Sequence, residues 1–180
     1  MKFLTFFSAI LLSLSIFFTP LSISAAVNEA SKAGETVDVY GLFWPVVPGT
    51  TVADSMFWFK QLKEGISGLF TFGNIKKSGH QIEISEKRLI EAYKLFENKD
   101  YTNAQKSLDL NKKARDEALK LKKKAVEEKA DALELTNKLV KSLQNQEKAL
   151  AFLMTKVPED QKAKIEGFLK DLPLQTSEAK

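Results

Sequence analysis

Histidine, cysteine and paired acidic residues carry much of protein chemistry, and this sequence offers few of them. It contains one histidine, His80, and no cysteine. A zinc site needs several His, Cys or carboxylate ligands, and an activated nucleophile needs a neighbouring base. His80 alone supports neither. Its place near the expected start of a helix favours a surface histidine or a partly buried one with its hydrogen bonds satisfied.

The densest acidic group comprises Glu127, Glu128 and Asp131. Acids at adjacent or four-residue spacing on a long helix usually face solvent, whereas general acid–base catalysis needs carboxylates positioned against a substrate. The sequence also has no glycine-rich loop of the kind that cradles phosphate. We therefore expect a protein that is not an enzyme, with no catalytic residues, no cofactor and no metal.

The amino terminus predicts export. One lysine precedes an apolar run from Phe3 to Phe18, and small residues follow at positions 22–26. This pattern is typical of a secretory signal peptide, and Ser24 and Ala26 fit cleavage after Ala26. The alternative is a retained membrane anchor, but the run is shorter than the roughly 20 apolar residues of a span. The expected location is the periplasm, the cell surface or the medium.

Removing 26 residues from 180 leaves 154, enough for one domain with a single hydrophobic core. One of the 27 basic residues lies in the signal peptide, so 26 remain against 23 acidic residues. A net charge of +3 is too small to argue for a polyanionic partner, and no nucleic acid is expected. Without cysteine there is no disulfide and no lipoprotein acylation site, so packing alone must hold the fold.

Apolar spacing predicts an all-α fold. Residues 80–157 contain no glycine and no proline. The one clear break is at residues 97–100, where four polar residues separate two apolar patterns and Asp100 can cap a new helix. We therefore expect an antiparallel helical hairpin, with one helix ending near Asn98 and the next beginning at Tyr101.

A short N-terminal helix is expected from Asp54 to Phe70, and either Asp54 or Ser55 can act as its cap. Its apolar residues recur at three- and four-residue steps: Phe59, Leu62, Ile66, Leu69 and Phe70. Two glycines, Gly65 and Gly68, weaken this helix by about 1 kcal/mol each, so it should be stable only when docked. We expect Phe59 to meet Leu89 and Phe96 in the core. The first hairpin helix then begins between Ile75 and Gln81.

The helix from Tyr101 carries a coiled-coil-like apolar stripe from Ala118 to Val157. Continuous helix to residue 155 would be about 80 Å long, beyond a compact domain of this size. The helix either projects or bends back, near residues 136–137 or 144–146. Since neither place has glycine or proline, projection or a partner is favoured. Leu135 and Leu139 then become candidate binding residues, for a second copy or for an envelope protein.

Residues 27–53 are expected to form an extended leader. Its segment 40–49 combines two prolines and two glycines with large apolar side chains, which disfavours regular helix and demands burial. One interpretation is an extended segment lying over the core. The alternative is a projecting ligand site with Phe43 and Trp44 at its tip.

At the other end, Pro158 suits the first turn of a helix. Its apolar face, which includes Ile165 and Leu172, should fold back on the preceding helix. The helical domain is thus expected to span residues 54–172, and the polar residues 173–180 to form a disordered tail.

Seven basic side chains fall between positions 112 and 124: Lys112, Lys113, Arg115, Lys120, Lys122, Lys123 and Lys124. Outside the cytoplasm they could make weak contact with a membrane surface or an anionic wall polymer. The alternative is a solvated helix face, which is favoured because acids lie at pairing distance along the same helix.

Several motifs resemble a bacterial family of exported proteins classed as a domain of unknown function. They are Pro48-Gly49, Phe59-Lys60 with Glu64, Leu69-Phe70-Thr71, Arg88-Leu89-Ile90-Glu91-Ala92 and Val157-Pro158-Glu159. The resemblance covers about residues 40–172, and departs at Ser55-Met56, where the family has a proline. It implies a helical, extracytoplasmic protein. Some related domains occur on anti-sigma-factor-like proteins, and no activity is implied.

Together these features predict an exported, non-enzymatic binding or scaffolding protein that acts through helical surfaces. The alternative is an extracytoplasmic sensor or regulatory domain, for envelope stress or anti-sigma-type signalling.

Overall fold

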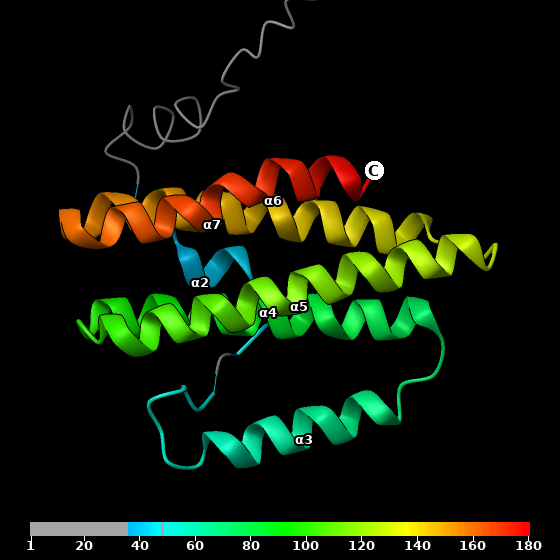
Figure 1. Cartoon of the computed structure of the whole chain (residues 1–180), viewed down its shortest axis with the longest axis horizontal. Helices are drawn as coiled ribbons and strands as arrows, with labels where there is room; N and C mark the ends of the chain where they lie inside the picture. The colour runs from blue at the N-terminus through cyan, green and yellow to red at the C-terminus, as the bar shows by residue number, and fades with distance from the viewer. Residues whose placement is uncertain (1–35, 48) are drawn as a thin grey trace, which may run out of the picture.

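The computed structural model describes residues 36–47 and 49–180 (Figure 1). Over this part of the chain 78% of the residues are helical and none forms a strand, which confirms the predicted all-α fold. The predicted signal peptide and residues 27–35 of the predicted leader lie outside the described residues.

Six helices follow one another in the described chain. They are α2 (Val39–Leu42), α3 (Phe57–Leu69), α4 (Asn74–Glu97), α5 (Tyr101–Glu127), α6 (Leu133–Lys156) and α7 (Glu159–Glu178). In Figure 1, α4 and α5 form one layer, α6 and α7 form a second, and α3 lies apart on the outer side of the first layer. The predicted hairpin of α4 and α5 and the predicted folding back of α7 on α6 are both confirmed.

The core of the bundle is built from the apolar stripe that the sequence shows between residues 118 and 157. Leu139, Leu143 and Leu150 are all buried there. Leu135 and Leu139 retain only 5% and 1% of their exposure, so the prediction that they bind a partner is wrong. They are covered by other helices of the same chain.

The predicted continuous helix from Tyr101 to residue 155 is also wrong, because α5 ends at Glu127 and α6 returns along the bundle. The reversal is centred on Lys129, which adopts a left-handed φ of 57°. Its N–H donates to the carbonyl of Val126 at 2.9 Å, and the N–H of Ala130 donates to that of Ala125 at 3.0 Å. This is a Schellman motif, which usually places glycine at the left-handed position.

The turn between α4 and α5 has the same construction. Lys99 has a φ of 60°, its N–H donates to the carbonyl of Phe96, and the N–H of Asp100 donates to that of Leu95. Asp100 then caps α5 as predicted, since its carboxylate accepts from the N–H of Asn103. At both turns a lysine therefore occupies the left-handed position at which glycine is the usual residue.

The predicted disordered tail at 173–180 is wrong, because α7 continues through Pro173 to Glu178. Leu172 and Ala179 are fully buried on either side of the proline. Between them, the side chain of Gln175 accepts from Nη1 of Arg115 at 2.7 Å and donates to Asp116 at 2.6 Å. These contacts hold the last turns of α7 on α5 despite the backbone hydrogen bond that proline cannot make.

The predicted extended leader is helical at one place, α2. Asp38 caps it by accepting from the N–H of Gly41 at 2.9 Å. Val39 and Phe43 are buried against the bundle, with 1% and 3% exposure. Phe43 is therefore a core residue rather than the tip of a ligand site, whereas its neighbour Trp44 is 82% exposed.

One polar layer crosses the bundle interior. Asn111 of α5 donates to the backbone carbonyl of Ser85 at 2.7 Å and to the side chain of Gln146 at 2.8 Å. Gln146 of α6 in turn donates to the hydroxyls of Ser85 and Ser142. Three helices are thus linked by side chains that are all buried.

Candidate binding surface

Helix α3 is attached to the bundle in an unusual way, because none of its residues is buried. At about 100° per residue, Phe57, Lys60 and Glu64 lie on one side of the helix, and this side faces α4. Gly68 continues the same side, where a β-carbon would lie 3.7 Å from the ring of His80. The contacts between α3 and the bundle are therefore made by its polar side.

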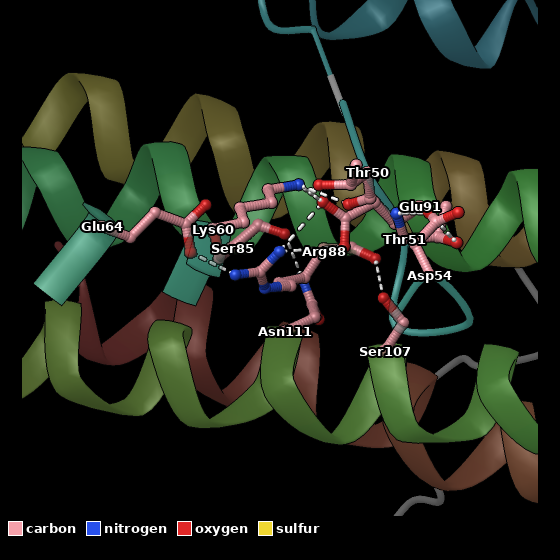
Figure 2. Close-up of polar contacts among 10 residues, drawn as sticks. All are labelled: Thr50, Thr51, Asp54, Lys60, Glu64, Ser85, Arg88, Glu91, Ser107 and Asn111. Carbon is pink, nitrogen blue, oxygen red and sulfur yellow. Dashed lines mark hydrogen bonds and ion pairs between the residues drawn. The ribbon is translucent and has the colours of Figure 1, made fainter. Parts of the chain in front are cut away.

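A cluster of charges joins the two helices (Figure 2). Nη1 of Arg88 donates to both carboxylate oxygens of Glu91, each at 2.9 Å, within α4. From α3, Glu64 pairs with Nη2 of Arg88, and Lys60 pairs with Glu91. The ring of Phe57 lies 4.8 Å from the Arg88 guanidinium, a cation–π contact.

Neighbouring segments complete this cluster. Nζ of Lys60 also donates to the backbone carbonyl of Thr50 at 2.8 Å, and Ser107 of α5 donates to the carbonyl of Arg88 at 2.9 Å. Arg88 and Glu91 are 2% and 0% exposed. Burial raises the pKa of Glu91, although Arg88 and Lys60 oppose this by favouring the carboxylate.

The opposite side of α3, continued by the residues at its two ends, is apolar and open to solvent. The eight residues of this outward face are between 45% and 78% exposed: Met56, Trp58, Phe59, Leu62, Ile66, Leu69, Phe70 and Phe72. Scattered exposed apolar residues are ordinary in soluble proteins, but a continuous set along one helix marks an interaction site.

The predicted docking of α3 by its apolar residues is therefore wrong. Leu89 and Phe96 are buried as expected, but Phe59 is 52% exposed and does not meet them. The physical reason is that α4 presents Arg88 and Glu91 toward α3, and two buried charges require charged partners.

Asp54 does not cap α3 either. The cap position is Met56, which makes no side-chain hydrogen bond, and α3 begins at Phe57. The carboxylate of Asp54 instead accepts from the N–H and the hydroxyl of Thr51, and these hydrogen bonds lower its pKa. Asp54 thus shapes the turn that leads into α3.

A groove of about 950 Å³ lies between α3 and the α4–α5 layer. His80 is partly buried in its wall, with Nε2 3.4 Å from the backbone oxygen of Glu64. The groove is lined by charges of both signs, including Lys77, Asp109 and Lys112. His80 therefore contributes to the packing of α3, as a partly buried histidine.

The basic residues predicted to form a patch have different surroundings. Arg115 is 1% exposed and lies in the core. Lys112 pairs with Asp171 at 2.5 Å, and Lys120 with Glu117 at 3.1 Å. With Arg115 buried, the seven residues do not form a single patch.

The acidic residues Glu127, Glu128 and Asp131 are exposed around the turn between α5 and α6, as predicted, and Asn74 donates to Glu128 at 2.7 Å. Among residues 36–47 and 49–180, no group of three or more His, Cys, Asp or Glu side chains is placed to hold a metal ion. Within the same ranges, no helix combines the length and apolar character needed to cross a membrane.

Comparison with known proteins found no matching family model, no matching curated protein and no matching solved structure.

Sequence reasoning missed the outward face because it assumed that an apolar stripe turns inward. One signal was present. Lys60 and Glu64 lie four residues apart on the side of the helix opposite its apolar residues, and Arg88 and Glu91 lie three apart, with the apolar Leu89 and Ile90 between them. The two pairs are complementary in charge.

Proposed function

We propose that the protein is an exported, non-enzymatic binding protein, and that the outward face of α3 is its docking surface. The observation that carries this proposal is the exposure of eight large apolar residues on and beside one helix. Covering such a face removes apolar area from water, worth about 25 cal/mol per Å². Export is supported by the predicted signal peptide.

The way α3 is held supports the same proposal. Its polar side is fixed by Lys60 and Glu64, so its apolar side points away from the bundle without any rearrangement. The bundle, whose own apolar side chains are packed inside, acts as the scaffold that presents this face. A preformed surface binds without the entropy cost of ordering a segment.

Photo-crosslinking in cells that make the full chain tests the proposal. A photoreactive amino acid at Leu62 should label a partner, whereas the same group at Leu174 should not. Leu174 is the matched control, because it is 68% exposed but lies on α7 of the bundle. Equal labelling at the two positions would remove the support for a docking surface on α3.

A regulatory or sensor role is the second candidate function. It is favoured by the attachment of α3 through charges and one aromatic contact, with no buried apolar side chain. A helix held in this way can be released when its partner or its ionic surroundings change. Amide hydrogen exchange of α3 at low and high salt tests this role, since an exchange rate independent of salt would argue against a releasable helix.

A further inference from the structure

We propose that the occupant of the outward face is the surface of a membrane containing anionic lipids, into which α3 inserts its apolar side while lying parallel to the bilayer. This inference rests on the proposed function and names the chemistry of its partner. Three observations favour it: the shape of the face, its composition and the charges beside it.

The face has the shape of a ridge. The residues of α3 that line the groove toward the bundle are Gln61, Glu64, Gly65, Gly68 and Leu69, so that of the eight residues of the outward face Leu69 alone borders the groove. Figure 1 shows α3 as the outermost helix, roughly parallel to the α4–α5 layer. Its 13 residues are about 20 Å long, too short to span a bilayer but suited to lie in its interface.

The composition is that of an interfacial helix. Four of the eight residues are aromatic, namely Trp58, Phe59, Phe70 and Phe72, and these are 52–78% exposed. Tryptophan and phenylalanine on one side of a helix, with lysine on its polar flank, are typical of segments that lie at the boundary of headgroups and acyl chains.

The charges match an anionic surface. Residues 56–77 hold four lysines and one glutamate, a net charge of +3. Lys60 and Glu64 are engaged in the cluster with Glu91 and Arg88, while Lys63 of α3 and Lys76 and Lys77 in the first turn of α4 are exposed, Lys77 at the border of the groove. Each exposed lysine near an anionic bilayer adds to the attraction between the protein and the membrane surface.

The test measures the fluorescence of Trp58 itself, so that membrane binding by other segments of the full chain does not produce the same signal. The chain has two tryptophans. Replacing the exposed Trp44 by phenylalanine leaves Trp58 as the only one. Vesicles of phosphatidylcholine and phosphatidylglycerol in equal parts should shift Trp58 emission to the blue, and bromine-labelled acyl chains should quench it. Vesicles of phosphatidylcholine alone should give a weaker effect.

In the same Trp44→Phe chain, Leu62→Glu with Ile66→Glu should weaken vesicle binding by at least about tenfold, because two inserted side chains become charged. The matched control is Leu133→Glu with Leu174→Glu, two apolar residues of the bundle that are 69% and 68% exposed. The control should leave the Trp58 shift unchanged. A second variant, Lys63→Gln with Lys76→Gln, should weaken binding to the anionic vesicles several-fold. It leaves the apolar residues of the outward face unchanged.

Trp58 that stays in water while the protein is on vesicles would overturn the membrane proposal, as would an equal loss in the bundle control. If Leu62 also crosslinks to a protein, or sedimentation shows a dimer that Leu62→Glu with Ile66→Glu dissociates, the docking surface stands and its occupant is a protein or a second copy. If Trp58 does not respond and Leu62 labels nothing beyond the Leu174 control, the proposed function fails as well.

Discussion

Helices α3 and α7 are both amphipathic and both peripheral, yet they turn opposite sides to the bundle. In α7, Ile165, Leu169 and Leu172 are buried with exposures of 0–1%. In α3, the equivalent apolar residues face solvent and the polar side is docked. An apolar stripe therefore shows that a helix face needs cover, but it does not show where the cover comes from.

The difference lies in the surfaces that receive the two helices. α7 packs on α6, and Leu150 and Leu153 of α6 belong to the same buried apolar core as Ile165, Leu169 and Leu172 of α7. α3 instead meets Arg88 and Glu91 of α4, whose charges are buried and need partners. Where the receiving surface is ionic, an amphipathic helix docks by its charges and leaves its apolar side for another occupant.

The largest expected effect compares one leucine from each helix. Leu172→Ala in α7 should lower the free energy of unfolding by about 2–5 kcal/mol, since it leaves a cavity in the core. Leu62→Ala in α3, half exposed, should change it by less than about 0.5 kcal/mol. Urea unfolding followed by circular dichroism measures both. Comparable losses would mean that α3 is part of the cooperative core.

Next in size is the removal of the charge that receives α3. Arg88→Met leaves Glu91 with Lys60 alone and Glu64 with no cation in the cluster, which should cost about 1–3 kcal/mol. The rate of amide hydrogen exchange should rise more in α3 than in α5. The control, Lys138→Met, breaks a pair with Glu83 that is about half exposed and should cost less than about 1 kcal/mol. Unchanged protection of α3 would show that Arg88 does not hold it.

A smaller effect follows from the ionisation of Glu91. Its pKa in the folded protein is raised above the ordinary value of 4.5, so the folded state binds a proton more readily than the unfolded state. Its contribution to stability is therefore present below about pH 4.5 and is lost as the pH rises through the raised pKa. Glu91→Gln should make the free energy of unfolding less dependent on pH above 4.5. Burial also raises the pKa values of Glu86 and Glu147, and these two residues are present in both the unchanged protein and the Glu91→Gln variant.

The smallest expected effect concerns Arg115, which ties α7 to α5. Burial lowers its pKa to about 10, and its Nε and Nη2 have no hydrogen-bond partner among the described residues. Because a buried charge is costly to desolvate, Arg115→Met should raise the melting temperature slightly, by the equivalent of up to about 1 kcal/mol. Differential scanning calorimetry at pH 7 measures the shift. A marked loss instead would mean that the bond to Gln175 outweighs desolvation.

The sequence predicts the helices well and their ends less well. α4 ends at Glu97, one residue before the predicted Asn98, and begins at Asn74, one residue before the predicted interval from Ile75 to Gln81, since apolar periodicity reports the side chains that the core selects. The turn at Lys129 could not be predicted, because a Schellman motif is specified by backbone hydrogen bonds and a lysine gives no sign of it. The helical end of α7 was hidden for a similar reason, since Gln175 and Ala179 are polar or small and yet are buried by α5 and its neighbours.

The outward face of α3 was recognisable in part. The spacing of Leu62, Ile66 and Leu69 predicts an apolar stripe, and that stripe exists. Its direction depends on contacts between residues that are 24 and 31 positions apart in the chain, Glu64 with Arg88 and Lys60 with Glu91. Periodicity within one helix carries no information about such contacts. Leu135 and Leu139 were misassigned for the same reason, because their cover comes from helices whose return depends on the turn at Lys129.

The polar layer of Asn111, Gln146, Ser85 and Ser142 has a consequence for alignment rather than for strength. Stripes built from leucine and alanine could slide past one another by one helical turn with little loss of apolar contact. A slide of about 5.4 Å would separate Asn111 from both of its acceptors and leave buried amides unpaired. The hydrogen bonds of the layer thus favour a single axial alignment of α4, α5 and α6. By fixing α4, it also fixes where Arg88 and Glu91 stand to receive α3.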